Sequence, residues 1–184
     1  MSYVDLICQE SISLISGVKN STCINDKLCL GNNFEIYLSF ELPPAAFFNH
    51  IIKARLILFK IPFNFTDTHS NPWNNQYSVY PLLDFFSAYS NWYEPPKTDN
   101  RLKINYEDQA SISYSEIDIT KIAEGWINKK PENKGLLLRS TPDARCLVYA
   151  SAQNMIIGMR PFIRLTYRGF SKPLSAAPCI VNVE

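Results

Sequence analysis

Residues 34–42 alternate between apolar and polar side chains, and this alternation limits what the chain can fold into. The apolar positions are Phe34, Ile36, Leu38, Phe40 and Leu42, and the positions between them are Glu35, Tyr37, Ser39 and Glu41. A period of two residues belongs to a strand with one buried face. The pattern therefore predicts a β-strand and favours a protein built on sheets.

Further strand signals follow along the chain. Residues 52–59 repeat the alternation, but Ile57 and Phe59 make the second face apolar too, which is typical of a strand covered on both sides in a sandwich. Residues 163–167 again alternate between apolar and polar side chains and predict a last strand with one solvent-exposed face. Weaker signals lie at 11–15, 76–80, 112–116, 135–139 and 145–149.

Helical signals are few. We expect one short helix at about 83–92 and one at about 120–127, where Ile122 and Trp126 lie four residues apart on one side and Asp118 or Thr120 can cap the first turn. Burial of that face makes Trp126 a structural core residue. The sequence thus predicts an all-β fold, an antiparallel jelly-roll-like β-sandwich with one or two short helices.

A series of motifs links these elements to a known module. They are E-I-D-I-T at 116–120, Trp126 and Asn128, N-K-G-L-L-L at 133–138, A-S-A at 150–152, and R-P-F-I-R-L-T-Y at 160–167. The series resembles the DNRLRE-domain family, a β-sandwich module also classed among carbohydrate-binding modules. Residues 34–42 and 52–59 resemble its paired strands, and Trp92 with Glu94 resembles its W-x-E element.

The resemblance has a departure and two limits. The family's T-W-N-N reads Thr98-Asp99-Asn100, without the Trp, so a role of that Trp does not carry over. The likeness covers residues 10–168, which we expect to be the β-sandwich module. Residues 1–9 are expected to form an N-terminal arm, and residues 169–184 a C-terminal tail or arm.

Composition excludes several partners. The 184 residues match one domain, and 18 Lys and Arg against 17 Asp and Glu give a net charge of +1, so we expect no nucleic acid as a partner. No apolar run reaches the roughly 18 residues that a membrane-spanning helix needs. Residues 1–9 carry Asp5 and no basic stretch, which argues against a secretory signal peptide.

Motifs for chemistry are missing from the sequence. No nucleophile elbow, phosphate loop or zinc-protease motif occurs, and His50 and His69 stand alone in loop contexts. Acidic residues at 94, 99, 107, 108, 116 and 118 are read as solvated loop charges, since nothing selects two of them as a catalytic pair. We therefore expect no enzyme and no cofactor, and we select no metal ligands. A structural calcium ion stays open as an alternative, because the loops at 32–33 and 67–75 supply oxygen ligands, although without a diagnostic spacing.

Aromatic residues between 73 and 93 suggest a ligand. Exposed rings stack on sugar faces, so Trp73, Trp92 and Tyr93 are the candidates for ligand binding, with asparagines nearby for hydroxyl groups. The alternative is that these rings cover an edge of the sandwich or contact another protein.

The five cysteines have no metal-site spacing. Cys23 and Cys29 are close enough for a local disulfide, and Cys146 suits a buried thiol. Cys8 and Cys179 lie in the expected arms, where they could cross-link neighbouring subunits by disulfides.

Two functions remain. The first is a non-catalytic structural subunit of a surface or spore-coat type assembly, which self-associates through its terminal arms into filaments or rings. The alternative is a carbohydrate-binding module that recognises a polysaccharide, as the resemblance implies. The expected location is the cell or spore surface without a recognisable signal peptide, or alternatively the cytoplasm.

Overall fold

The longest element, strand β1 (Ser2–Ile15), belongs to both halves of the main sheet. Its first part, through Ile7, pairs with β10 (Phe162–Tyr167), and its second part, from Cys8, pairs with β3 (Phe34–Phe40). The register shifts between Cys8 and Glu10. Such a bulge bends a strand and increases its twist, so β1 turns the corner between the two halves.

A computed structural model describes residues 2–17, 26–31, 33–43, 51–62, 75–87, 89–141 and 143–168. Its main sheet has eight antiparallel strands in the order β6-β5-β8-β3-β1-β10-β4-β7. The remaining strands of this sheet are β4 (Ile51–Phe59), β5 (Gln76–Pro81), β6 (Ile104–Glu107), β7 (Tyr114–Asp118) and β8 (Leu136–Ser140). A second, two-stranded sheet pairs β2 (Lys27–Leu30) with β9 (Leu147–Ala150).

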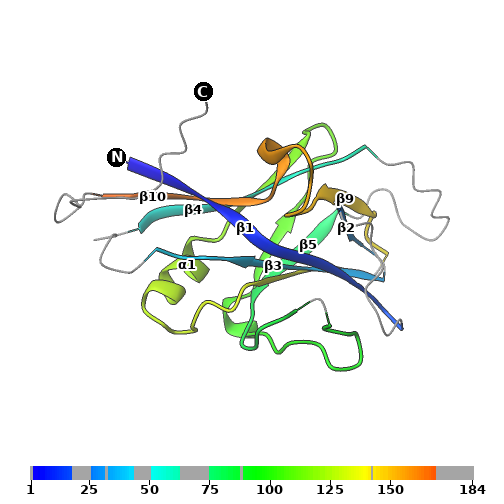
Figure 1. Ribbon diagram of the computed structural model, residues 1–184, viewed down its shortest axis with the longest axis horizontal. Coiled ribbons are helices and arrows are strands. Elements are labelled where there is room, and N and C mark those ends of the chain that lie inside the picture. Colours follow the sequence, from blue (N-terminus) through cyan, green and yellow to red (C-terminus); the bar gives the residue numbers. More distant parts are fainter. Residues whose placement is uncertain are drawn as a thin grey trace.

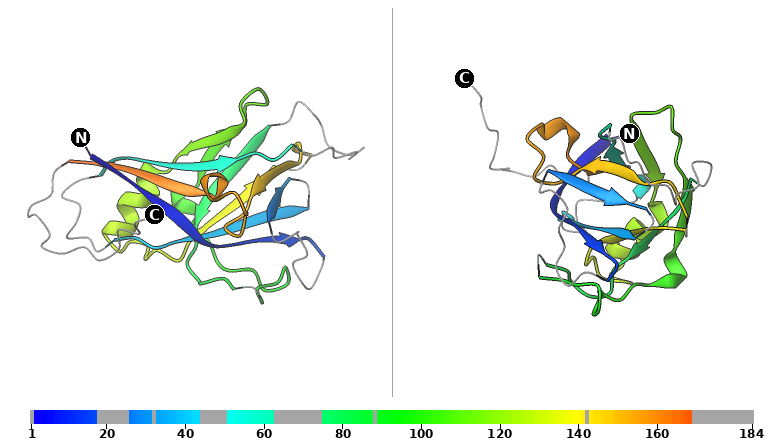
Figure 2. Two further views of the ribbon diagram at one scale, coloured as in Figure 1. Left: turned by 45° about the horizontal axis from the view of Figure 1, so that its top comes forward. Right: turned by 90° about the vertical axis from the view of Figure 1, so that its right-hand side faces the viewer.

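The main sheet folds over itself, so its two halves face each other in an arrangement between a sandwich and a nearly closed barrel (Figures 1 and 2). This confirms the all-β fold class. The main core lies between the halves and contains Leu38, Leu56, Ile117, Leu138 and Leu165, all almost fully buried. The terminal strands β6 and β7 leave an unpaired seam between them, because β6 pairs only with β5 and β7 only with β4 among the described strands.

A second, smaller core lies on the outer face of β3 and β8. Tyr37 and Leu137 are covered there by Leu82 and Phe86, and the rings of Tyr37 and Phe86 are 5.8 Å apart. This cover buries Glu35 as well, which pairs with Arg139 and accepts a hydrogen bond from the Tyr37 hydroxyl at 3.0 Å. The polar side of the 34–42 alternation is therefore buried by a segment distant in sequence.

One α-helix is present in the described chain, α1 (Thr120–Ile127). The prediction of a second helix at about 83–92 is wrong: the described residues there form bends, turns and irregular chain. The reason is that residues 83 and 84 form hydrogen bonds with Lys97, at the other end of the loop, in place of helical hydrogen bonds. The Leu83 amide donates to the Lys97 carbonyl, and the Asp84 carboxylate accepts from the Lys97 amide, so these groups fix an open loop in place of helical turns.

The two expected arms have different outcomes. Residues 2–9 do not form an arm, because they lie within β1 and pair with β10 and β3 of the same chain. Residues 169–184 lie outside the described residues. No helix of the described chain is long and apolar enough to span a membrane.

Candidate functional site

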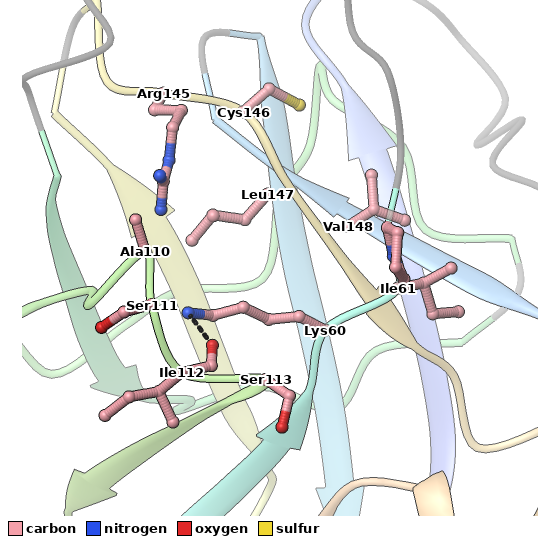
Figure 3. Close-up of a pocket in the computed structure, with 11 residues that line it drawn as sticks. Lys60, Ile61, Ala110, Ser111, Ile112, Ser113, Arg145, Cys146, Leu147 and Val148 are labelled. Atoms are coloured by element: carbon pink, nitrogen blue, oxygen red, sulfur yellow. Dashed lines mark hydrogen bonds between the residues drawn. The ribbon is translucent and has the colours of Figure 1, made fainter.

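A pocket, here called the β4–β9 pocket, lies where β4 ends and β9 begins and has a volume of about 440 Å³. Its walls come from three segments: 60–62 after β4, 110–113 between β6 and β7, and 145–148 at the start of β9. Figure 3 shows the Arg145 guanidinium and the Lys60 side chain reaching across it. Its apolar lining includes Leu147, which points toward the two cations in Figure 3, and Ile61 and Val148, which lie together away from them.

Behind these two cations lies a buried carboxylate. The side chain of Asp108, which follows β6, has no exposed surface, and it lies 2.7 Å from Lys60 Nζ and 2.7 Å from Arg145 Nη2. The Ser115 hydroxyl, on β7, donates to Asp108 Oδ1 at 2.6 Å. A charge removed from water is strongly destabilising unless it is paired and hydrogen-bonded, and all three partners meet that need.

Tyrosine hydroxyls extend this cluster. Tyr149 Oη lies 2.8 Å from Ser115 Oγ, and the Tyr77 hydroxyl donates to the Arg145 carbonyl at 2.6 Å. Burial raises the pKa of Tyr149 well above its usual value, and the negative charge of Asp108 raises it further. Burial also raises the pKa of Tyr77. Both phenols therefore stay protonated and serve as hydrogen-bonding groups.

The cluster holds the fold together. Besides Asp108, Lys60 Nζ donates to the carbonyls of Gln109, at 2.6 Å, and Ile112, at 2.9 Å, so its three N–H groups have three acceptors. These bonds attach the loop between β6 and β7 to the end of β4, next to the unpaired seam. Because the carboxylate is sealed from the pocket and the ammonium is saturated, neither group is placed to act as a general acid or base.

Sequence reasoning did not single out Lys60 or Arg145, and it read Asp108 as a solvated loop charge, which is wrong because the Asp108 side chain is completely buried. They come from three distant segments, and none follows a catalytic or ligand spacing. The only local signal is the position of each charge directly beside a strand end.

Of the residues predicted from sequence, Trp126 is 3% exposed and belongs to the main core. Helix α1 places it there together with Ile122 and Ala123. Its indole Nε1 has no hydrogen-bond acceptor among the described residues.

Two of the three predicted ligand-binding aromatics, Trp92 and Tyr93, lie in the loop after β5. Trp92 is half-buried, Tyr93 is exposed and donates its hydroxyl to the Gly17 carbonyl at 3.3 Å, and Trp73 lies outside the described residues. The same loop exposes Phe85 and Tyr89, which the sequence did not select, and Tyr89 is 93% exposed. The loop thus presents three exposed rings.

The structure argues against the prediction that Cys8 cross-links subunits. Its side chain is 4% exposed and donates to the Glu10 carbonyl, and burial raises the pKa of the thiol to about 12. The folded chain therefore offers neither access to this sulfur nor a thiolate. No disulfide joins two of the described cysteines, Cys8, Cys29 and Cys146. The Cys23–Cys29 pair and Cys179 involve residues outside the described ones and stay predictions.

A protruding turn between β9 and β10 carries three consecutive exposed apolar residues (Figures 1 and 2). Met155, Ile156 and Ile157, here called the apolar tip, are 91%, 62% and 67% exposed. Isolated exposed apolar residues are ordinary, but a contiguous group marks a contact surface. The sequence analysis did not select it.

Hydrogen bonds fix the apolar tip in place. The buried Asn154 accepts from the Ile156 amide through Oδ1 and donates to the Asp26 carbonyl through Nδ2, both at 3.0 Å. The Asn154 carbonyl accepts from Arg160 Nε, and a 3₁₀ turn, η3 (Ile157–Met159), closes the segment. The apolar side chains are therefore presented on a rigid base.

The described residues contain no group of three or more His, Cys, Asp or Glu side chains that could hold a metal ion. The comparisons add no family, since no family model matches the sequence and none of the curated proteins is significantly similar to it. The resemblance to the DNRLRE-domain family therefore stays a prediction from the motifs quoted above.

Proposed function

We propose that this chain is a non-catalytic structural subunit that self-associates, as part of a surface or spore-coat type assembly. The observation that carries the proposal is the apolar tip, Met155, Ile156 and Ile157, held rigidly clear of the strands. The saturated hydrogen bonding of Lys60 and the pairing of Asp108 support a structural role for these charged groups.

Energetics favour a contact at the apolar tip. Burying a Met or Ile side chain contributes about 1.5–3 kcal/mol, so three of them outweigh many polar rim contacts. Because Asn154 already fixes the backbone, little further entropy is lost on binding. The net charge of +1 means that two copies repel each other only weakly.

The ends of the chain contribute differently to this proposal. Since residues 2–9 are used within β1, an N-terminal arm is not part of it. The segment 169–184 with Cys179 remains the proposed second contact, and the proposed location remains the cell or spore surface.

Sedimentation velocity across a concentration series tests the self-association. We expect wild-type protein to form larger species as its concentration rises, and the triple variant Met155→Ser, Ile156→Ser, Ile157→Ser to associate at least tenfold more weakly. The control is the double variant Phe85→Ser, Tyr89→Ser, which removes exposed rings from another loop and should associate like wild type. Wild-type protein that stays monomeric throughout would refute the proposal.

Disulfide cross-linking is tested separately on a non-reducing denaturing gel. We expect multimers that disappear with thiol and that are absent in Cys179→Ser, whereas Cys8→Ser should leave them unchanged. Multimers that survive in Cys179→Ser would remove Cys179 from the proposal.

Polysaccharide binding is the second candidate function, favoured by the exposed rings of Phe85, Tyr89 and Tyr93 on one loop. Flat rings of this kind stack on sugar faces. We expect Tyr89→Ala and Tyr93→Ala to weaken binding in a polysaccharide panel, with Tyr3→Ala, an exposed ring on β1, as the matched control. A panel without any binding to the wild type would reject this candidate.

A further inference from the structure

The apolar tip is convex and small, and this limits what it can contact. It exposes three side chains, a surface on the order of a few hundred Å², whereas stable symmetric interfaces bury about 800 Å² on each partner. Two tips that meet each other would therefore bury little surface and pack poorly. A convex group of this size needs a concave receptor.

The same chain carries such a receptor in the β4–β9 pocket. Its volume of about 440 Å³ lies within the range of about 300–1,000 Å³ found for pockets that bury small ligands. Among its apolar lining residues, Ile112 is 37% exposed and Ile61 is half-buried, and Leu147 and Val148 lie beneath the surface at 6% exposed each. It therefore has room and surface for an Ile or Met side chain.

Charge does not oppose this fit. The segment 153–159 carries no charged residue, so it brings no group that would be desolvated without a partner. The two cations of the pocket are already paired with Asp108, and Lys60 is saturated. An uncharged occupant leaves these bonds intact, whereas an acidic segment would compete with Asp108 for them.

The pocket and the apolar tip lie at the two ends of the same short strand: the pocket at the start of β9 and the tip after its end. Residues 145–148 of the pocket lead into β9, and the chain leaves β9 through Ser151 and Asn154 to reach the tip. The Ser151 hydroxyl oxygen accepts a hydrogen bond from the Gln153 backbone amide, and the Asn154 backbone amide donates to the Ser151 carbonyl, so the link is ordered. One rigid unit thus carries both a protrusion and a hollow.

We propose that the apolar tip of one copy inserts into the β4–β9 pocket of a second copy. The two surfaces differ, so the contact is head-to-tail: a bound pair still offers a free tip on one copy and a free pocket on the other. Repetition of such a contact gives open chains or, where the rotation closes, rings. This inference rests on the proposed self-association and names the two surfaces that meet.

Complementation between two blocked variants tests it. The tip variant is the triple Ser substitution at 155–157, and the pocket variant is Ala110→Arg, which places a long charged side chain at an exposed position on the pocket wall. We expect each variant alone to associate at least tenfold more weakly than wild type. Mixed in equal amounts they should form a heterodimer and nothing larger, because one supplies the only intact tip and the other the only intact pocket.

Controls separate the outcomes. Ser87→Arg adds the same side chain at an exposed position elsewhere and should associate like wild type, and circular dichroism and thermal midpoints should show that all variants are folded. A pocket variant that associates like wild type, or a mixture that stays monomeric, overturns the tip-in-pocket contact while self-association itself stands. Wild-type protein that never associates overturns both. Flotation of monomeric wild type, but not of the tip variant, with phosphatidylcholine vesicles would assign the tip to a lipid surface instead.

Discussion

Lys60 and Asp108 form an ion pair of 2.7 Å in which the carboxylate is completely buried. Asp108 also binds Arg145 and Ser115, so one side chain joins the end of β4, the start of β9 and strand β7. These contacts lie beside the seam at which β6 and β7 do not pair. A side-chain cluster thus connects the two halves of the sheet where a backbone ladder does not.

Replacing Asp108 should therefore be strongly destabilising. Asp108→Ala leaves Lys60 and Arg145 beside an empty, poorly solvated site, and breaking a buried pair on one side costs about 3–5 kcal/mol. Urea unfolding measures the change, with the exposed Glu124→Gln as a control expected within about 0.5 kcal/mol of wild type. A loss under 1 kcal/mol would show that the cluster is not needed to join the halves.

Trp126→Ala should lower the free energy of unfolding by about 3–5 kcal/mol, because it opens a large cavity between α1 and the main core. Trp92→Ala, at a half-buried loop position, should cost much less. Thermal or urea unfolding compares the two. Should the Trp126 variant keep its stability and lose binding to a ligand, its placement as a purely structural residue would be untenable.

Gly135 should not tolerate a side chain. Its φ is +108°, and a Cβ atom there would lie 2.5 Å from the Leu38 carbonyl oxygen, so both the backbone conformation and the space oppose Ala. We expect Gly135→Ala to destabilise by more than about 1 kcal/mol. Gly158→Ala is the control, since no atom lies within 4 Å of the added Cβ. Equal midpoints for the two variants would contradict this.

The Cys8 thiol should be unreactive in the folded protein. Its pKa of about 12 and its burial leave almost no accessible thiolate at pH 8. Iodoacetamide labelling followed by peptide mass spectrometry should find Cys8 unmodified before unfolding and modified in denaturant. Rapid labelling of native Cys8 would mean that β1 opens at this point.

The raised pKa of Cys8 also makes the stability of the protein depend on pH. Since the folded pKa is raised above the usual 9.0, the folded state holds this proton more tightly, so stability is complete below pH 9 and falls as pH rises toward 12. The difference in stability between wild type and Cys8→Ala should therefore move against wild type over this window. Urea midpoints at pH 8 and pH 10.5 give the comparison, and a difference that is constant between the two would contradict it.

The sequence patterns predicted those elements whose formation depends on residues that are close together in the sequence. The alternation at 34–40 gave strand β3, and the spacing of Ile122 and Trp126 gave α1. Contacts between segments that are distant in the sequence determined the features that these patterns did not predict. Glu35 is buried because Phe86 and its neighbours cover that face, and the chain at 83–92 is open because it bonds to Lys97.

The prediction of an N-terminal arm at residues 1–9 overlooked a strand pattern that is present in the sequence. Val4, Leu6 and Cys8 alternate with Tyr3, Asp5 and Ile7, which is the period of a strand, and the first set lies inward. The Asp108 cluster and the apolar tip had no such signal. The first depends on three segments that meet only in the folded chain, and the second depends on exposure, which an apolar run of three residues does not reveal.

The pairing of β1 with β10 also governs when this protein can fold during its synthesis. Ser2 pairs with Tyr167, so β1 is synthesised long before β10, the strand with which its first part forms a ladder. Until then the inward side chains Val4 and Leu6 and the free edge of β4 stay open to other chains. A nascent chain stalled before β10 is made should therefore depend on chaperones, whereas release of the completed strand closes the sheet in one step.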